Sequence, residues 1–384
     1  MNYFSSNFTL GILGGGQLGK MLLQETRKWD IQTHVLDPNP EAPCKIGCNR
    51  FETGNLMDFE TVYNFGKKVD VLTFEIESVN VEALEKLESE GVKVYPGAST
   101  LRNIQDKGIQ KQFYKKHEIP TAPFRIFETQ RDLKEAIARK EIHLPFVWKS
   151  CKGGYDGRGV SIIRDIKDLA SVPGSACIAE SLILFKNELA VIVARNPSGE
   201  TKTYPVVEME FHPEANQVEY VICPARIDEN VAGKARDVAT KVSEALKHVG
   251  LLAVEMFQTE KDEILVNEVA PRPHNSGHYS IEASYTSQFE QHLRAILDLP
   301  LGRTDSKVGG VMVNLVGAEG YTGPVIYKNM DEILVMDGVT PHIYGKKETR
   351  PFRKMGHVTI VNKDIKVARK TAEEVKRKIK VISA

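Results

Sequence analysis

The chain has 384 residues, and its 51 Lys and Arg balance 51 Asp and Glu, so the formal net charge is zero. This length predicts two or three domains, and the lack of a basic arm or acidic tail disfavours nucleic acid and membrane surfaces as partners. No apolar run approaches the roughly 18 residues of a membrane helix, and no secretory signal opens the chain. Five scattered cysteines fit a reducing compartment, so we expect a cytoplasmic protein.

The first ~100 residues alternate strands with helices. Thr9–Leu13 is predicted as a strand, 18–28 as a helix, and 32–36 and 69–74 as further strands. This alternation predicts a parallel sheet whose binding site lies at the carboxyl ends of its strands.

A glycine motif, Gly14-x-Gly16-x-x-Gly19, follows the first strand and opens the first helix. Asp37 ends the next strand, about 20 residues further on, where a ribose-binding acid lies in dinucleotide-binding folds. By itself this pattern favours a nicotinamide enzyme, but a helix N-terminus binds any phosphate. Gln17 adds an amide that could recognise a substrate. A tight turn needed only for packing is the alternative.

From about residue 104 the pattern changes. Helices are predicted at 107–117 and 131–140, followed mainly by strands, at 146–149, 160–163, 177–180, 188–195, 201–210 and 218–222. A long helix at 230–249 precedes a strand pair, 251–258 and 263–269, and further helices lie within 281–297. From about residue 302 the pattern mixes strands, at 311–316 and 355–361, with a closing helix at 364–380.

A second glycine-rich stretch follows Lys149, which ends its strand. Gly153, Gly154, Gly157 and Gly159 fall within seven residues. Each glycine costs roughly 0.5–1 kcal/mol inside a helix or strand, but lets backbone amides approach an anion closely. With Arg158 inside the loop, the composition indicates a flexible flap over polyphosphate. The alternative is a surface hairpin.

Glu255 and Glu268 lie on the two strands of a predicted hairpin with its turn at 259–262. This turn places Glu255 opposite Val266, with Glu268 two residues further along and on the same face. Such diagonal neighbours are about 7–8 Å apart, so both carboxylates could bind one or two hard cations such as magnesium. The alternative is a pair of solvated charges.

The run 267–278 follows directly and contains Arg272, His274 and Asn275. This density of polar groups beside a carboxylate strand suits the binding of a small oxyanion next to a metal. An exposed polar loop is the alternative.

Other groups could complete a nucleotide site. Lys107, after the capping residue Asp106, and Lys149 could each hold a phosphate as a point charge. The backbone of 177–188 could meet an adenine edge, and Glu188 could accept from ribose hydroxyls. The basic cluster 344–354 suits a substrate phosphate or an ordinary charged turn.

Together these motifs resemble the ATP-grasp family, and most closely its members that carboxylate 5-aminoimidazole ribonucleotide in purine biosynthesis. The most specific runs are G-G-Y-D-G-R-G and N-E-V-A-P-R-P-H-N-S-G-H, and the resemblance spans nearly the whole chain. It implies an α/β fold with an N-terminal, doubly wound parallel-sheet domain (1–105), a two-lobed ATP-grasp domain (106–300, with a flap lobe at about 120–185 and a metal and ATP lobe at about 186–300) and a small C-terminal α+β domain (301–384).

The resemblance also implies the reaction. ATP, bicarbonate and 5-aminoimidazole ribonucleotide would give the N-carboxylated ribonucleotide, ADP and phosphate, through carboxyphosphate. Mg²⁺ or Mn²⁺ would be needed, the enzyme would be a homodimer, and a separate mutase would use the product. Two departures from the family pattern are Lys107, where some relatives have Arg, and Val160, where Gln is common.

Roles follow from matching positions. ATP would be bound by Lys107, Lys149, Gly153, Gly154, Tyr155, Asp156, Gly157, Arg158, Gly159, Glu180, Ser181, Leu182, Ile183, Glu188, His212 and Asn267, with 180–183 along the adenine. Tyr155, Asp156, Arg272, His274 and Asn275 would face bicarbonate and the aminoimidazole. The ribonucleotide would be anchored by Gln17, Glu75, Lys346 and Arg353, and the metal by Glu255 and Glu268.

Three other functions remain open on sequence alone. A sister ATP-grasp ligase would share Lys149, Glu255 and Glu268, but the run from Asn275 to His278 and the basic tail argue against it. A nicotinamide oxidoreductase rests on the first glycine motif only. A nucleotide sensor would bind ATP without turnover.

Overall fold

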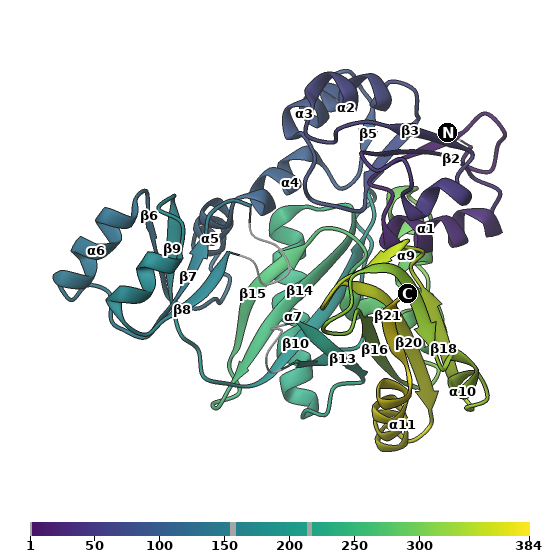
Figure 1. Ribbon diagram of the computed structural model, residues 1–384. Helices are drawn as coiled ribbons and strands as arrows, with labels where there is room; N and C mark the ends of the chain where they lie inside the picture. Colours follow the sequence, from purple (N-terminus) through teal and green to yellow (C-terminus); the bar gives the residue numbers. More distant parts are fainter. Residues whose placement is uncertain (1, 154–158, 213–216) are drawn as a thin grey trace.

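The computed structural model describes residues 2–153, 159–212 and 217–384 (Figure 1). The predicted flap residues Gly154, Tyr155, Asp156, Gly157 and Arg158 therefore lie outside the described residues.

The N-terminal region is a sheet in the order β3-β2-β1-β4-β5, and every pairing in it is parallel, as predicted. Its central strands β1 and β4 are mainly apolar and buried, because both faces of the sheet are covered by helices. The strands are β1 (Thr9–Leu13), β2 (Gln32–Asp37), β3 (Arg50–Thr53), β4 (Val71–Phe74) and β5 (Lys93–Val94). The helices are α1 (Gln17–Lys28), η1 (Pro43–Ile46), α2 (Phe59–Gly66), α3 (Val81–Ser89) and α4 (Ala98–Gln105).

A smaller lobe, which we call the flap lobe, projects to the left in Figure 1. Its antiparallel sheet has the order β6-β9-β7-β8. The lobe comprises α5 (Lys107–Lys116), β6 (Phe124–Phe127), α6 (Gln130–Ala138), β7 (Phe146–Ser150), β8 (Val160–Ile163), η2 (Ile166–Ser171) and β9 (Cys177–Ser181). Asp106 caps α5 by accepting hydrogen bonds from the amides of Gly108 and Ile109, which fixes where Lys107 begins the helix.

The large central sheet has the order β15-β14-β10-β12-β13-β16-β20-β18, with β11 added beside β10. Its first part comprises β10 (Phe185–Arg195), β11 (Thr201–Thr203), β12 (Val207–Phe211), β13 (Val218–Cys223), α7 (Glu229–Leu246), β14 (Gly250–Thr259), β15 (Ile264–Ala270), η3 (Asn275–Gly277), α8 (Ser280–Ala283) and α9 (Gln288–Ile296). The single strand predicted at 201–210 is wrong, since Pro205 lies in a gap between β11 and β12. Proline has no N–H to donate to the sheet.

The C-terminal segment extends this same sheet, because β13 pairs with β16. It comprises β16 (Gly309–Val316), β17 (Gly323–Lys328), α10 (Met330–Leu334), β18 (Val339–Ile343), β19 (Glu348–Thr349), β20 (Lys354–Asn362), α11 (Ile365–Lys378) and β21 (Lys380–Ser383). Its core includes Tyr220 and Ile222 of β13. The central and C-terminal regions thus share one sheet and part of one core, while the predicted boundary near 300 stays a prediction.

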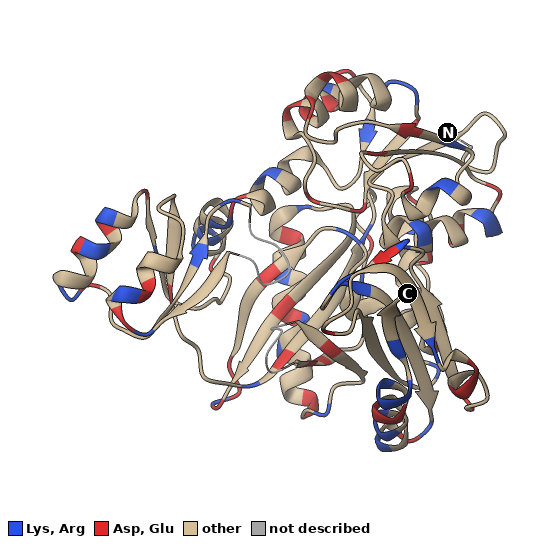
Figure 2. Cartoon of the chain, in the orientation of Figure 1, with Lys and Arg blue, Asp and Glu red and all other residues tan. Residues whose placement is uncertain are grey.

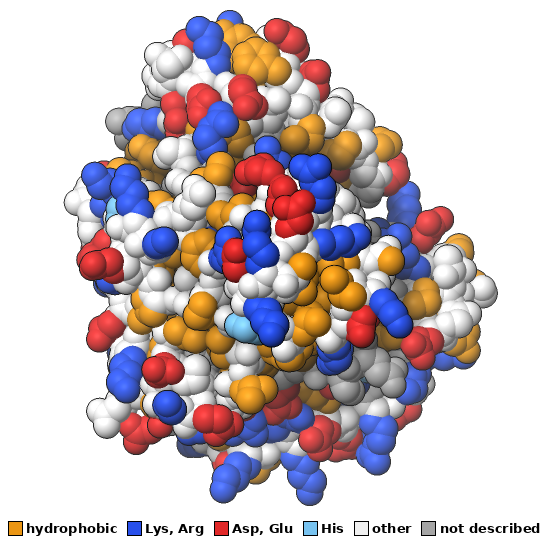
Figure 3. All heavy atoms as spheres, turned by 90° about the vertical axis from the view of Figure 1, so that its left-hand side faces the viewer, with side chains coloured by type: hydrophobic (Ala, Val, Ile, Leu, Met, Phe, Trp, Pro, Cys, Tyr) orange, Lys and Arg blue, Asp and Glu red, His pale blue; other side chains and the backbone are white. Residues whose placement is uncertain are grey.

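On the face seen from the side of the flap lobe, basic and acidic side chains are interspersed (Figure 3). Within the described residues, no helix is both long enough and apolar enough to cross a membrane.

Candidate functional site

The two glutamates predicted as metal ligands lie directly opposite each other on the hairpin of β14 and β15. Glu255 pairs with Glu268 and Met256 pairs with Val266, with a register shift between them. The prediction that both carboxylates share one face is confirmed. Their predicted diagonal placement is wrong, because a β-bulge at Asn267 adds one residue to β15 and moves Glu268 opposite Glu255.

The bulge also determines where Asn267 points. In a regular strand, Asn267 and Glu268 would project to opposite faces. In this structure both bind lysines of the flap lobe. The Asn267 Oδ1 accepts a hydrogen bond from Lys149 Nζ at 2.8 Å, and the Glu268 Oε2 lies 2.6 Å from Lys107 Nζ. The structure therefore brings together three residues predicted to bind ATP, Lys107, Lys149 and Asn267, and one predicted to bind the metal, Glu268.

A third carboxylate, Glu188, lies on the same face of the sheet. Glu255 pairs with Ala190 of β10, and Glu188 is two residues from Ala190 along that strand. Burial and the nearby Glu268 raise the pKa of Glu188 to about 7. Burial, then Glu268 and Glu188, also raise the pKa of Glu255. The ammonium of Lys107 instead holds the pKa of Glu268 well below its usual range. Figure 2 shows acidic positions gathered on these central strands.

The side chain of Glu180, on β9, is buried between two lysines. Its Oε2 lies 2.7 Å from Lys149 Nζ and its Oε1 lies 2.6 Å from Lys111 Nζ. Its predicted place beside adenine stays a prediction. Ser181 ends β9, and Leu182 and Ile183 lie in the link to β10. Sequence reasoning missed Lys111. The available signal was its spacing from Lys107, because helix residues four apart share a face.

The polar run after β15 contacts the N-terminal, central and C-terminal regions. Arg272 forms an ion pair with Glu77 of the N-terminal region at 2.8 Å. His274 Nε2 lies 3.3 Å from Glu255 Oε1. Asn275 exchanges amide hydrogen bonds with an asparagine of β16. This cluster therefore lies beside the carboxylates, where the N-terminal, central and C-terminal regions meet.

The predicted ribonucleotide anchors come from the N-terminal region, with Gln17 and Glu75, and from the segments on either side of β19, with Lys346 and Arg353. Gln17 begins α1, and Lys20 of the same helix donates to the carbonyl of Ile343 at 2.7 Å, close to Lys346. Lys346 Nζ donates to the Lys354 carbonyl at 2.7 Å. Arg353 donates to a backbone carbonyl of β19, and the ring of His212 lies edge-on to that of the neighbouring Phe352. Their roles in binding stay predictions.

The first glycine motif is occupied by the chain's own carboxylates. The amide of Gly15 donates to Asp37 Oδ2 at 2.6 Å. The amides of Gly16 and Gly19 donate to the two oxygens of Glu75, at 2.9 and 3.3 Å. Burial raises the pKa of Glu75 to about 7 although these amides oppose that shift. The donors that would hold a dinucleotide phosphate are thus already used.

Three family models match successive parts of the chain. The ribonucleotide synthetase preATP-grasp domain matches residues 8–105, the ATP-grasp domain residues 112–289, and the phosphoribosylaminoimidazole carboxylase C-terminal domain residues 310–371.

Individual relatives agree with these matches. The chain is 39% identical over 356 residues to N5-carboxyaminoimidazole ribonucleotide synthase of Bacillus subtilis, which covers 92% of this chain and 91% of the relative. It resembles the crystal structure of N5-carboxyaminoimidazole ribonucleotide synthetase from Thermotoga maritima, with 44% identity, a TM-score of 0.89 and coverage of 98% and 100%. It also resembles the Aspergillus clavatus synthase in complex with ADP and 5-aminoimidazole ribonucleotide, with 33% identity, a TM-score of 0.86 and coverage of 96% and 98%.

Proposed function

Since this chain belongs to the N5-carboxyaminoimidazole ribonucleotide synthase family of ATP-grasp enzymes, we propose that it carboxylates 5-aminoimidazole ribonucleotide with bicarbonate at the expense of ATP. The products are the N5-carboxylated ribonucleotide, ADP and phosphate, in purine biosynthesis. We place the enzyme in the cytoplasm as a homodimer whose product passes to a separate mutase.

The observation that carries this proposal is the contact between lysines of the flap lobe and polar side chains of the central sheet. Lys107 lies 2.6 Å from Glu268, and Lys149 lies 2.8 Å from Asn267. A nucleotide triphosphate bound between the lobes would take its charge compensation from these lysines. Phosphoryl transfer depends mainly on such positioning and charge neutralisation.

The carboxylates fit a divalent metal. Glu255 and Glu268 are opposite each other on one face, and their mutual repulsion contributes to the raised pKa of Glu255. Magnesium prefers oxygen ligands and commonly shares one or two carboxylates with substrate phosphates. When bound, the metal would neutralise charge on the phosphates. We therefore assign Glu255 and Glu268 to Mg²⁺ or Mn²⁺, with Asn267 beside them.

The chain's own groups suggest how bicarbonate is used. Lys149 would stabilise the negative charge on the γ-phosphate while bicarbonate attacks the phosphorus to form carboxyphosphate. His274 lies 3.3 Å from Glu255, and we propose that His274 and Arg272 bind bicarbonate beside the phosphates. Carboxyphosphate would break down to carbon dioxide and phosphate near the exocyclic amine of the ribonucleotide. The amine would then attack carbon dioxide and lose a proton, which gives the carbamate. From the family resemblance, we propose Asp156 as the acceptor of the amine proton and Tyr155 as a further residue that contacts bicarbonate or the aminoimidazole.

A nicotinamide oxidoreductase is disfavoured, because Glu75 and Asp37 occupy the amides of the first glycine motif. The decisive experiment measures ADP release with ATP, magnesium and bicarbonate, with and without 5-aminoimidazole ribonucleotide. Release that depends on the ribonucleotide, with a carbamate product that incorporates labelled bicarbonate, supports the proposal. ADP binding without turnover would indicate a nucleotide sensor instead.

A further inference from the structure

Lys111 is a buried lysine with no role in the function proposed above. Its side chain is 2% exposed, and its ammonium contacts Glu180, whose side chain is 3% exposed. It also donates to the hydroxyl of Thr121, which in turn donates to the carbonyl of Val266 at 2.7 Å. Val266 immediately precedes Asn267 on β15. Lys111 therefore connects the flap lobe to the strand that carries the predicted metal ligands.

Glu180 is shared between two ammoniums. One of its oxygens faces Lys111 at 2.6 Å and the other faces Lys149 at 2.7 Å. Burial alone would raise the pKa of Glu180, but the two ammoniums outweigh it and lower the pKa. Burial lowers the pKa of Lys111 to about 8, so this lysine is still mainly protonated at pH 7. The triad of Lys111, Glu180 and Lys149 thus carries one net positive charge.

That charge count matters for nucleotide binding. Without Lys111, the buried Glu180 would have Lys149 as its one remaining partner in the triad, and the net charge of the triad would fall to zero. An ion pair buried in this way is held tightly, because an unpaired charge in the interior is costly. Lys149 would then be drawn away from a phosphate toward Glu180.

We propose that Lys111 is a positioning residue of the ATP site, which neutralises Glu180 so that the charge of Lys149 stays available to the nucleotide phosphates. This inference rests on the proposed function, since it assumes that Lys149 binds those phosphates. It predicts that, as long as Lys149 is kept, nucleotide affinity follows the net charge of the triad rather than the presence of Lys111 itself.

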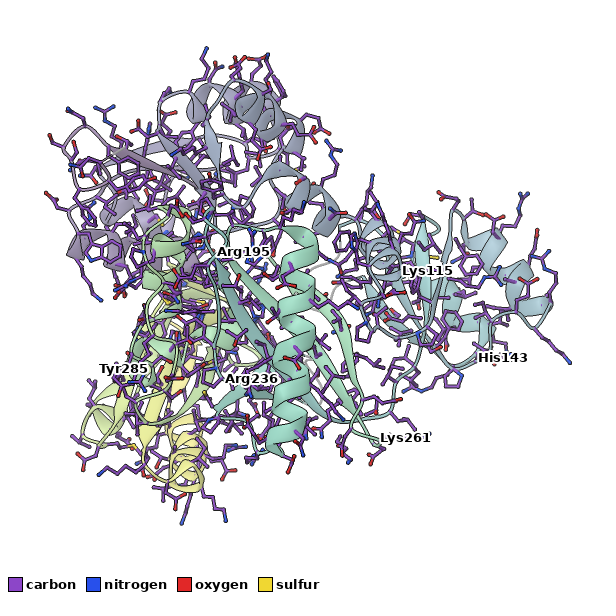
Figure 4. The ribbon with its side chains drawn as sticks, turned by 180° about the vertical axis from the view of Figure 1, so that it is seen from behind. Lys115, His143, Arg195, Arg236, Lys261 and Tyr285 are labelled. Atoms are coloured by element: carbon purple, nitrogen blue, oxygen red, sulfur yellow. The ribbon has the colours of Figure 1, made fainter. Side chains whose placement is uncertain are left out.

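The test is ADP binding by isothermal titration calorimetry, in the presence of magnesium. Lys111→Met changes the triad charge from +1 to 0 and is expected to weaken ADP binding about tenfold or more, since close charge pairs contribute on this scale. The double variant Lys111→Met with Glu180→Gln returns the charge to +1 and is expected to bind ADP at least about threefold more tightly than Lys111→Met. Lys115→Met removes an exposed lysine from the same helix (Figure 4) and is the matched control.

The outcomes distinguish this inference from the proposed function. If the wild type does not bind ADP, the proposed function fails and this inference fails with it. If the wild type binds ADP and Lys111→Met binds it equally well, the inference alone is overturned. A purely structural role would lower the melting temperature of Lys111→Met and leave the ADP affinity of the folded protein unchanged. Recovery of affinity in the double variant supports the inference, and continued weak binding contradicts it.

Discussion

Two parts of this molecule look equally suited to binding phosphate in the sequence, yet they differ in the structure. The first is the glycine motif at the start of α1, and the second is the space between the flap lobe and the central sheet. In the first, the amides of Gly15, Gly16 and Gly19 are bound by Asp37 and Glu75. In the second, Lys107 faces Glu268 and Lys149 faces Asn267, and these are the groups that we propose for the metal and the nucleotide.

The difference shows that glycines let an anion approach the backbone amides but do not supply the positive charge that neutralises it. A helix N-terminus attracts any anion, including a carboxylate from the same chain, and Glu75 fills that place in α1. At the second site the anions are partly neutralised by Lys107 and Lys149. The presence of cations close to these groups, rather than the glycine spacing, is therefore the reason why we propose the second site for the nucleotide.

The largest effect is expected at the central site, from Glu268→Gln. This change removes a charge that pairs with Lys107 and that we assign to the metal. Turnover should fall at least about 100-fold, the scale of losing one preorganised charge contact at a reacting phosphate. Steady-state ADP release measures it, with circular dichroism to show that the fold is kept. Glu263→Gln, at an exposed position before β15, is the matched control, and wild-type activity in Glu268→Gln would remove the metal assignment.

A smaller effect is expected from Asn267→Ala, which tests whether the bulge positions Lys149. This change removes the 2.8 Å hydrogen bond to the ammonium but leaves every charge in place. A hydrogen bond to a charged group contributes roughly 1.5–3 kcal/mol, so turnover should fall about tenfold. The ratio of turnover in Asn267→Ala to that in Glu268→Gln compares the effect of misplacing Lys149 with the effect of removing the charge of Glu268. Equal losses in the two variants would mean that the position of Lys149 matters as much as the charge of Glu268.

At the first glycine motif, we expect the titration of Glu75 to change the free energy of unfolding and not the binding of nucleotide. The pKa of Glu75 is raised from 4.5 to about 7, so between these values the folded state binds more protons than the unfolded state. Stability from this group is therefore present below pH 4.5 and is lost as the pH rises to about 7, by up to about 3 kcal/mol.

Urea unfolding of the wild type and of Glu75→Gln between pH 4.5 and 7.5 measures this effect. The wild type should lose stability relative to the variant across that range, while the KM for ATP is the same in both. A large rise in the KM for ATP in Glu75→Gln would mean that the first glycine motif takes part in nucleotide binding after all.

The sequence was sufficient to predict those features of the fold and the site that depend on a local pattern of residues. Apolar runs separated by helices predicted a parallel sheet and its strands β1, β2, β4 and β5, but β3, with the sequence Arg-Phe-Glu-Thr, was missed because it has no apolar run. The alternation of β14 and β15 placed Glu255 and Glu268 on one face. The bulge at Asn267 could not be predicted, because it changes the pairing without changing the apolar pattern.

Contacts between distant parts of the chain were also out of reach. Lys111 and Glu180 are 69 residues apart in sequence, and an isolated lysine on a helix is usually solvated. The break between β11 and β12 at Pro205 could have been predicted, because proline cannot donate a hydrogen bond within a sheet. The sequence analysis nevertheless predicted one strand through this position.

The smallest effect is expected from Lys107→Arg. Arginine keeps the positive charge beside Glu268. Burial opposes the charged form of Lys107, but the Glu268 carboxylate outweighs burial and raises the pKa of Lys107, so the charge is present in both proteins at neutral pH. An arginine adds a planar fork of donors that a carboxylate can bind at two points. Turnover should stay within about threefold of the wild type, whereas Lys107→Met should lose about 100-fold. If Lys107→Arg were as inactive as Lys107→Met, the shape of the lysine would matter at this site more than its charge, and the contrast with the first glycine motif would have to be explained by geometry.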